Sequence, residues 1–231
     1  MNRCFYLIFI FYSTFIYSQT FQNFNVSVNF NYTNTSKFYL QPDSPDPVVR
    51  SSYNELNDII SLSTELSIQM LENLYAGFWI EYVEKNLVIK NYNLGQISLD
   101  INDGYKIIPF EITLYYLLPF STEKFKFYMG GGAGFYFGKS NRNFENIYAV
   151  NDKINFDFGI QVSFTMDYII NSLIFLRTQM RFRDPNIELK SKYSDNSLIH
   201  NGRRYYIYPQ TFTTKTNVDG ISFCLGIGIH F

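Results

Sequence analysis

The last eleven residues of the chain, ISFCLGIGIHF from Ile221 to Phe231, decide the fold. Large apolar side chains alternate there with small or polar ones. Because successive side chains of a β-strand point to opposite faces, this alternation predicts a strand with one continuous apolar face. That face consists of Ile221, Phe223, Leu225, Ile227, Ile229 and Phe231. The sequence therefore predicts a sheet whose two faces meet different surroundings.

The same period of two recurs along the chain and predicts eight strands. The expected strands are Asn23–Asn34, Asp58–Met70, Leu74–Glu84, Tyr105–Leu118, Phe125–Gly138, Lys153–Met166, Leu173–Arg183 and a closing strand that starts near Thr213. Short links at Leu71–Asn73, Pro119–Lys124 and Asp167–Ser172 alternate with long links at Thr35–Asn57, Lys85–Gly104, Lys139–Asp152 and Asp184–Phe212. This arrangement indicates an all-β fold, a closed eight-stranded antiparallel up-and-down transmembrane β-barrel.

The N-terminal segment 1–18 predicts a secretory signal peptide. Arg3 supplies the positive charge, Leu7–Ile16 forms a short apolar core, and cleavage is expected after Ser18. The apolar core is too short for a transmembrane helix. We therefore expect the barrel domain to cover residues 19–231.

Composition agrees with a barrel and excludes several other classes. The chain has 20 Tyr and 24 Phe among 231 residues, as expected where aromatic rings form belts at two membrane interfaces. A formal net charge of −1 gives no case for nucleic-acid binding. Once Cys4 has left with the signal peptide, Cys224 is the only thiol, which excludes an internal disulfide and a cysteine metal cluster. We expect no cofactor and no metal.

Alternation alone leaves open which face of each strand points inward. The polar face is dominated by Ser, Asn, Gln, Thr and Gly, where a water-facing surface is expected to carry many Lys and Glu. Its few charges balance, which predicts a salt-bridge network inside a narrow lumen. The expected members are Glu65, Glu81, Glu111 and Asp157 against Lys126, Arg177, Arg181 and Arg183. A secreted lipocalin-like carrier, with its apolar face inward, is the alternative.

The segments YKIIPFEITLYY (Tyr105–Tyr116) and FKFYMGGGAGFYFG (Phe125–Gly138), with the terminal Phe231, resemble the small outer-membrane β-barrels. The likeness is greatest to OmpA/OmpX-type barrels and to the PorT-like barrels of Bacteroidetes-type bacteria. It implies a place in the cell outer membrane, contact with outer-membrane lipid, and recognition by the barrel-assembly machinery. The assembly signal would then be Phe231 with Ile229 and Ile227. The PorT likeness implies a component of a protein secretion machinery with a protein partner.

Motifs that carry chemistry are few. Ala133–Ser140 fits a relaxed phosphate-loop pattern, but aromatic residues fill it and no helical period follows. His200, near Ser197 in the longest link, is the one candidate for a barrel-embedded lipid-modifying enzyme. Gly130, Gly132 and Gly134 are expected on the inward face, making room for bulky neighbours such as Arg177 or Tyr128.

Arg203 and Arg204 precede a tyrosine-rich stretch and would contact lipid headgroups, or belong to an interfacial aromatic belt. With no catalytic constellation, we expect a non-enzymatic barrel. Its role would be structural or a surface interaction carried by the long extracellular loops.

Overall fold

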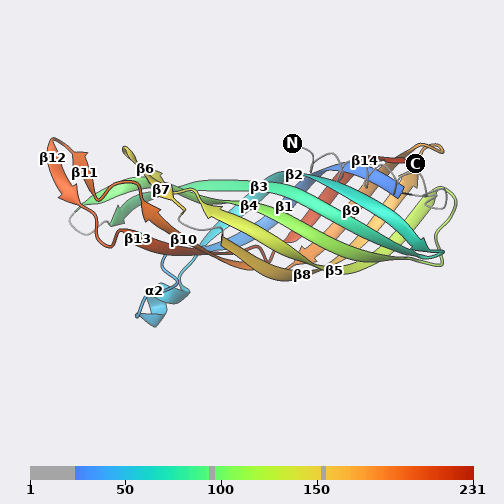
Figure 1. Ribbon diagram of the computed structural model, residues 1–231, viewed down its shortest axis with the longest axis horizontal. Helices are drawn as coiled ribbons and strands as arrows, with labels where there is room; N and C mark the ends of the chain where they lie inside the picture. The colour runs from blue at the N-terminus through green and yellow to red at the C-terminus, as the bar shows by residue number, and fades with distance from the viewer. Residues whose placement is uncertain (1–23, 94–96, 152–154) are drawn as a thin grey trace, which may run out of the picture.

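The computed structural model describes residues 24–93, 97–151 and 155–231, and these are almost entirely β-strand (Figure 1). The elements are β1 (Phe24–Tyr39), α2 (Pro47–Ser51), β2 (Asn54–Leu71), β3 (Leu74–Asn93), β4 (Ser98–Leu117), β5 (Phe125–Ser140), β6 (Asn143–Phe144), β7 (Ile147–Val150), β8 (Asn155–Ile169), β9 (Ile174–Arg183), β10 (Asn186–Tyr193), β11 (Ser197–His200), β12 (Arg203–Tyr206), β13 (Thr211–Asn217) and β14 (Ile221–His230). The predicted signal peptide, Asn23 and Lys153 lie outside the described residues. Nowhere in the described chain is there a helix with the length and apolar character needed to cross a membrane.

Eight strands pair in a circuit, which we call the ring. Antiparallel ladders lead from β1 through β2, β3, β4, β5, β8, β9 and β14 and back to β1. The tight connections β2–β3, β4–β5 and β8–β9 lie together at one end of the molecule (Figure 1). The predicted all-β antiparallel fold is confirmed.

The expected count of eight strands does not describe the whole sheet, which contains twelve. The strands β6, β7, β10 and β13 link β4 to β1 at the end of the molecule away from the tight connections. There β6 pairs with β4 and β13 pairs with β1. We call this part, with the separate β11–β12 hairpin, the extension (Figure 1). Three of the four predicted long links therefore consist largely of strands, whereas Thr35–Asn57 holds the helix α2 between the ends of β1 and β2. The predicted closing strand is two strands, β13 and β14.

The ring has an apolar outer face and a polar interior. On β14, Leu225 is 62% exposed, whereas the neighbouring Cys224 is 6% exposed. The same alternation holds on the other ring strands, where Phe, Ile, Leu, Val and Met point outward and Ser, Asn, Thr, Glu and Arg point inward. This orientation contradicts the carrier alternative, which requires an apolar lumen.

The extension has the opposite polarity, with an apolar interior. One buried cluster lies next to the ring and contains Phe38, Leu56, Ile59, Val83, Tyr105, Ile107, Tyr136, Ile187, Leu189 and Val218. A second contains Leu99, Ile101, Phe144, Ile147, Tyr193, Leu198 and Ile207. The inside–outside alternation shifts by one residue on β2 at Asp58, which has a positive φ of 56°.

The helix α2 interrupts the link between β1 and β2 and stands out from the side of the sheet (Figure 1). Asp46 caps it by accepting a hydrogen bond from the Val48 backbone N–H at 2.9 Å, and Pro47 occupies its first turn. None of its residues is buried. The helix is thus set by local signals and contributes nothing to either interior.

Candidate functional site

At the end of the ring near the tight connections, the interior holds a three-residue ion cluster centred on Arg177. Its guanidinium donates to both carboxylate oxygens of Asp167 at 2.8 Å and also to Glu65. β9, β8 and β2 supply the three residues, so the cluster joins separate parts of the wall. All three side chains are at most 5% exposed. Removal of one member of such a cluster strongly destabilises the fold, because an unpaired charge then stays buried.

A second group of ion pairs lies farther from the tight connections. Arg181 donates to Glu111 at 2.5 Å, and its guanidinium lies 3.6 Å from the centre of the Trp79 ring. Arg183 pairs with Glu81 at 2.7 Å and approaches Glu111 at 3.6 Å. Alternate residues of β9 therefore place three arginines in a column opposite carboxylates from β2, β3, β4 and β8.

Six of the eight residues expected in the lumen network take part in these pairs. Asp157 is half-buried near the upper end of β8 and accepts from the Phe158 backbone N–H. Lys126 is half-buried and lies opposite Asp167 in the β5–β8 register, but Arg177 holds that carboxylate. Asp167 itself was missed, because the sequence placed it in a tight turn, whereas β8 continues to Ile169.

The packed side chains leave little open space in the lower ring. A void of about 10 Å³, lined by Tyr75, Tyr115, Tyr128 and Arg177 among others, has room for a single water. Gly130 admits Tyr115, since a Cβ on Gly130 would meet Ser163 Oγ at 2.6 Å and the Tyr115 ring at 2.7 Å, whereas a Cβ on Gly132 or Gly134 would meet β4. The bulky neighbours of these glycines are thus Tyr115 and Glu111, and not Arg177 or Tyr128 as expected. A wide diffusion pore does not fit this interior.

The extension holds a further buried ion pair that the sequence did not reveal. The Arg142 guanidinium donates to Asp103 Oδ2 from Nε at 2.8 Å and from Nη2 at 2.5 Å, and to the Tyr193 hydroxyl at 3.2 Å. It also lies 4.3 Å from the Phe212 ring centre and 5.3 Å from that of Tyr92. Burial is the largest single influence and opposes its charge, but the Asp103 carboxylate together with Tyr193 and Tyr92 outweighs burial and raises the pKa of Arg142.

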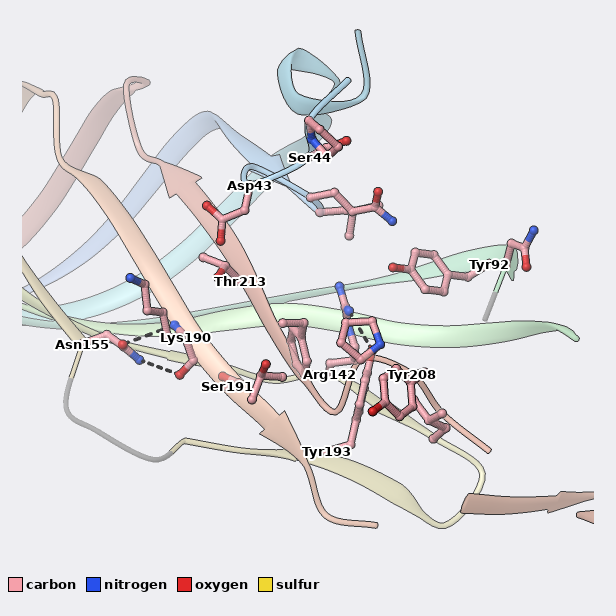
Figure 2. Close-up of a pocket in the computed structure, with 18 residues that line it drawn as sticks. Asp43, Ser44, Tyr92, Arg142, Asn155, Lys190, Ser191, Tyr193, Tyr208 and Thr213 are labelled. Atoms are coloured by element: carbon pink, nitrogen blue, oxygen red, sulfur yellow. Dashed lines mark hydrogen bonds between the residues drawn. The ribbon is translucent and has the colours of Figure 1, made fainter. Parts of the chain in front are cut away.

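This arginine lies at the wall of an open cleft of about 740 Å³ (Figure 2). Tyr92, Tyr193 and Tyr208 gather near Arg142 at one end of the cleft. The other end is polar and is formed by Asp43, Ser44, Asn155, Lys190, Ser191 and Thr213. The link after β1, the end of β3, and the segment from β10 to β13 supply most of this lining.

A gap between β8 and β10 lies next to the polar end of the cleft. Among the described strands, the part of β8 before Gln161 forms a ladder only with β5, because the ladder between β8 and β9 begins at Gln161. The side chain of Asn155 spans the gap to β10, donating to Lys190 O at 3.5 Å and accepting from Lys190 N at 3.2 Å. The Asn155 amide thus makes the two hydrogen bonds to the Lys190 backbone that a neighbouring strand would make. These bonds hold β8 and β10 together on this side of the cleft.

The other predicted site residues lie apart from the cleft and the lumen. Arg203 and Arg204 are exposed on β12, at the far tip of the extension and beyond the apolar outer face of the ring (Figure 1). His200 contacts Glu145 at 3.2 Å, and no serine, threonine or cysteine of the described chain bonds to it. Ala133–Ser140 is a paired part of β5 and not a loop. No cluster of three or more candidate metal ligands occurs in the described ranges.

The terminal aromatic residue is docked against the first strand. The Phe231 ring stacks on Phe24 with 5.0 Å between ring centres, and its backbone N–H donates to Phe24 O at 3.0 Å. Ile227 and Ile229 point outward on the apolar face. The three residues expected to form an assembly signal are therefore presented on the outside of the ring.

No protein-family model matches the chain, and no curated protein sequence is similar to it. Solved structures with a similar fold include the outer membrane protein OprG from Pseudomonas aeruginosa, with a TM-score of 0.60 and 12% identity. That match covers 91% of this chain and 96% of OprG. A major outer membrane protein from Thermus thermophilus has a TM-score of 0.53 and 9% identity, covering 90% of this chain and 99% of its own. The chain therefore has the fold of outer-membrane β-barrel proteins.

Proposed function

We propose that the protein is an integral outer-membrane β-barrel whose ring spans the bilayer and whose extension presents an interaction surface outside the cell. One observation carries this proposal, the reversal of polarity between the two parts. Apolar side chains cover the ring outside and fill the extension inside. Lipid solvates apolar side chains and water solvates polar ones, and a folded chain buries the side chains that its surroundings solvate poorly. The apolar outer face of the ring therefore suits lipid, and the polar outer face of the extension suits water.

In this arrangement the tight connections, the start of β1 and the end of β14 lie on the periplasmic side. The extension then rises from the extracellular side of the ring. The ring interior is filled by ion pairs, so transport through it is not the proposed role. The role is a non-enzymatic surface interaction, and it is assigned to the extension because the cleft lies there.

Cell fractionation tests the membrane assignment. We expect the protein in the outer-membrane fraction, with faster migration on an unheated gel than after boiling. Protease added to intact cells should cut the β11–β12 hairpin and leave the ring protected. A soluble periplasmic product would overturn the proposal, and a protected hairpin would reverse the proposed orientation.

The assembly signal is tested by deleting Phe231. The deletion removes the stacking contact with Phe24 and the proposed recognition by the barrel-assembly machinery, so we expect the outer-membrane amount to fall several-fold. The matched control, Phe120→Ala, removes another exposed aromatic residue from a turn at the same end. Equal amounts for the deletion and the unaltered protein would contradict the assembly role.

Two alternatives remain as outcomes of further tests. Affinity purification from native membranes would recover a stable protein complex if the chain is a PorT-like secretion component. The pairing of His200 with Glu145 is the one observation that favours a lipid-modifying enzyme. Changed lipid A in cells with the unaltered protein, lost on His200→Ala, would support that enzyme.

A further inference from the structure

We infer that the cleft of the extension is a binding site for uncharged carbohydrate. This inference rests on the proposed function and deepens it, because it names the ligand class of the proposed surface. Four properties of the cleft support it: aromatic surface, charge balance, available hydrogen-bonding groups, and rigidity.

The aromatic end offers ring faces of the kind on which sugars stack. Tyr193 is buried and packs against the half-buried Phe212 with 4.7 Å between their ring centres, so these two rings form the base of this end, and the half-buried Tyr92 lies beside Arg142. Tyr208 is 92% exposed and lines the rim, so its ring is open to a ligand (Figure 2). A pyranose ring has apolar C–H faces, and tyrosine combines an apolar body with a polar tip.

The charges that line the cleft cancel. Arg142 is neutralised by Asp103 within the wall, through two hydrogen bonds to Asp103 Oδ2. Asp43 and Lys190 add one charge of each sign at the polar end. A site for a sulfated or phosphorylated ligand would be expected to hold unpaired arginine or several lysines. The balance therefore favours a ligand without net charge.

Some hydrogen-bonding groups of the cleft lining are free to meet hydroxyl groups. The side chains of Gln41, Thr211 and Thr213 make no hydrogen bond to any other described residue. Sugar hydroxyls both donate and accept, as do these amide and hydroxyl groups. A purely apolar ligand would leave them unpaired, which disfavours its binding.

The walls are held in place before any ligand arrives. Arg142 is fixed by Asp103 and Tyr193, and the rings of Phe212 and Tyr92 pack on its guanidinium. The Asn155–Lys190 bonds hold the opposite side. A rigid cleft loses little entropy on binding, which helps a weakly interacting ligand such as a sugar. Its volume of about 740 Å³ lies within the usual range for small-ligand sites.

The experiment uses the full mature protein in detergent micelles. It is applied to an array of uncharged, sulfated and phosphorylated oligosaccharides, followed by calorimetric titration with the best uncharged trisaccharide. We expect binding to uncharged members, and at least about tenfold weaker affinity for Tyr208→Ala, equivalent to about 1.4 kcal/mol. Tyr206→Ala is the matched control, because it removes an exposed tyrosine on β12 that does not line the cleft.

Tyr92→Ala provides a second variant on a separate strand, and it should weaken binding by a similar factor. A second arm compares polysaccharide purified from the producing cells with the soluble trisaccharides, which separates the cell's own surface sugars from foreign ones. Binding of an uncharged sugar in either arm, with weaker affinity for both Tyr208→Ala and Tyr92→Ala, supports the inference.

Absence of uncharged ligands, binding confined to anionic sugars, or equal affinity for both cleft variants and Tyr206→Ala would overturn the inference. So would a peptide that competes for the cleft where no sugar does. In each case outer-membrane fractionation and hairpin cleavage on intact cells still report on the proposed function separately.

Discussion

The ring and the extension share the strands β1–β4 but have opposite interiors. In the ring, buried Arg177 bridges two carboxylates while Leu225 faces outward. In the extension, buried Leu189 lies in an apolar cluster while Asn186 faces outward. The same alternation of side chains therefore builds two interiors. In the proposed arrangement the medium outside also differs, lipid around the ring and water around the extension, and this medium selects the side chains that can be left exposed.

The largest effect is expected from breaking the ion cluster of the ring. Arg177→Met leaves Glu65 and Asp167 buried without a cation, so the free energy of unfolding should fall by about 3–5 kcal/mol. Urea unfolding followed by gel migration in detergent measures it. The control is Lys37→Met, whose pair with Asp219 is partly exposed, so the free energy of unfolding should fall much less. Equal losses would mean that the interior pairs do not support the ring.

A charge on the outer face should distinguish lipid from water. Leu225→Arg places a cation on the apolar outer surface of the ring, which faces lipid in the proposed arrangement. We expect the free energy of unfolding in lipid vesicles to fall by about 2–4 kcal/mol. Asn186→Arg, at an outward position of the extension, should change this free energy by less than about 0.5 kcal/mol. If the two substitutions had equal effects, the assignment of the ring to the bilayer would be wrong.

Loss of the buried pair in the extension should act locally. Arg142→Met strands the Asp103 carboxylate and removes the group on which Phe212 and Tyr92 pack. We expect faster proteolysis of the extension, because local opening becomes easier, with an unchanged protease-resistant ring. Arg204→Met, on the exposed tip, should leave the cleavage rate unaltered. Global unfolding by Arg142→Met would show instead that both parts form one cooperative unit.

The smallest perturbation is chemical labelling of Cys224. Its thiol is 6% exposed inside the ring, so a maleimide reagent should label it only after denaturation. Ile199→Cys on β11 is the comparison, because Ile199 is 61% exposed and its replacement should react in the folded protein. Rapid labelling of Cys224 without denaturant would show an open ring interior.

The ring was predictable because its outward apolar positions repeat every two residues over many residues. The extension was not, since a strand such as β10 carries its apolar residues inward and reads like a surface segment of any soluble protein. Arg142 and Asp103 lie 39 residues apart on different segments, and only the register brings them together. Asp167 was missed because turn signals mark strand ends only to within a few residues.

The exposed helix α2 has a practical consequence. It lies between β1 and β2 in a side branch whose removal or replacement uncovers no core, and inserted chain is best tolerated at such sites. A peptide tag spliced into Pro47–Ser51 should be carried to the cell surface by a barrel that folds as before. In the proposed orientation the helix is thus an attachment point for surface display, and an antibody to the tag on intact cells would report the topology of the protein.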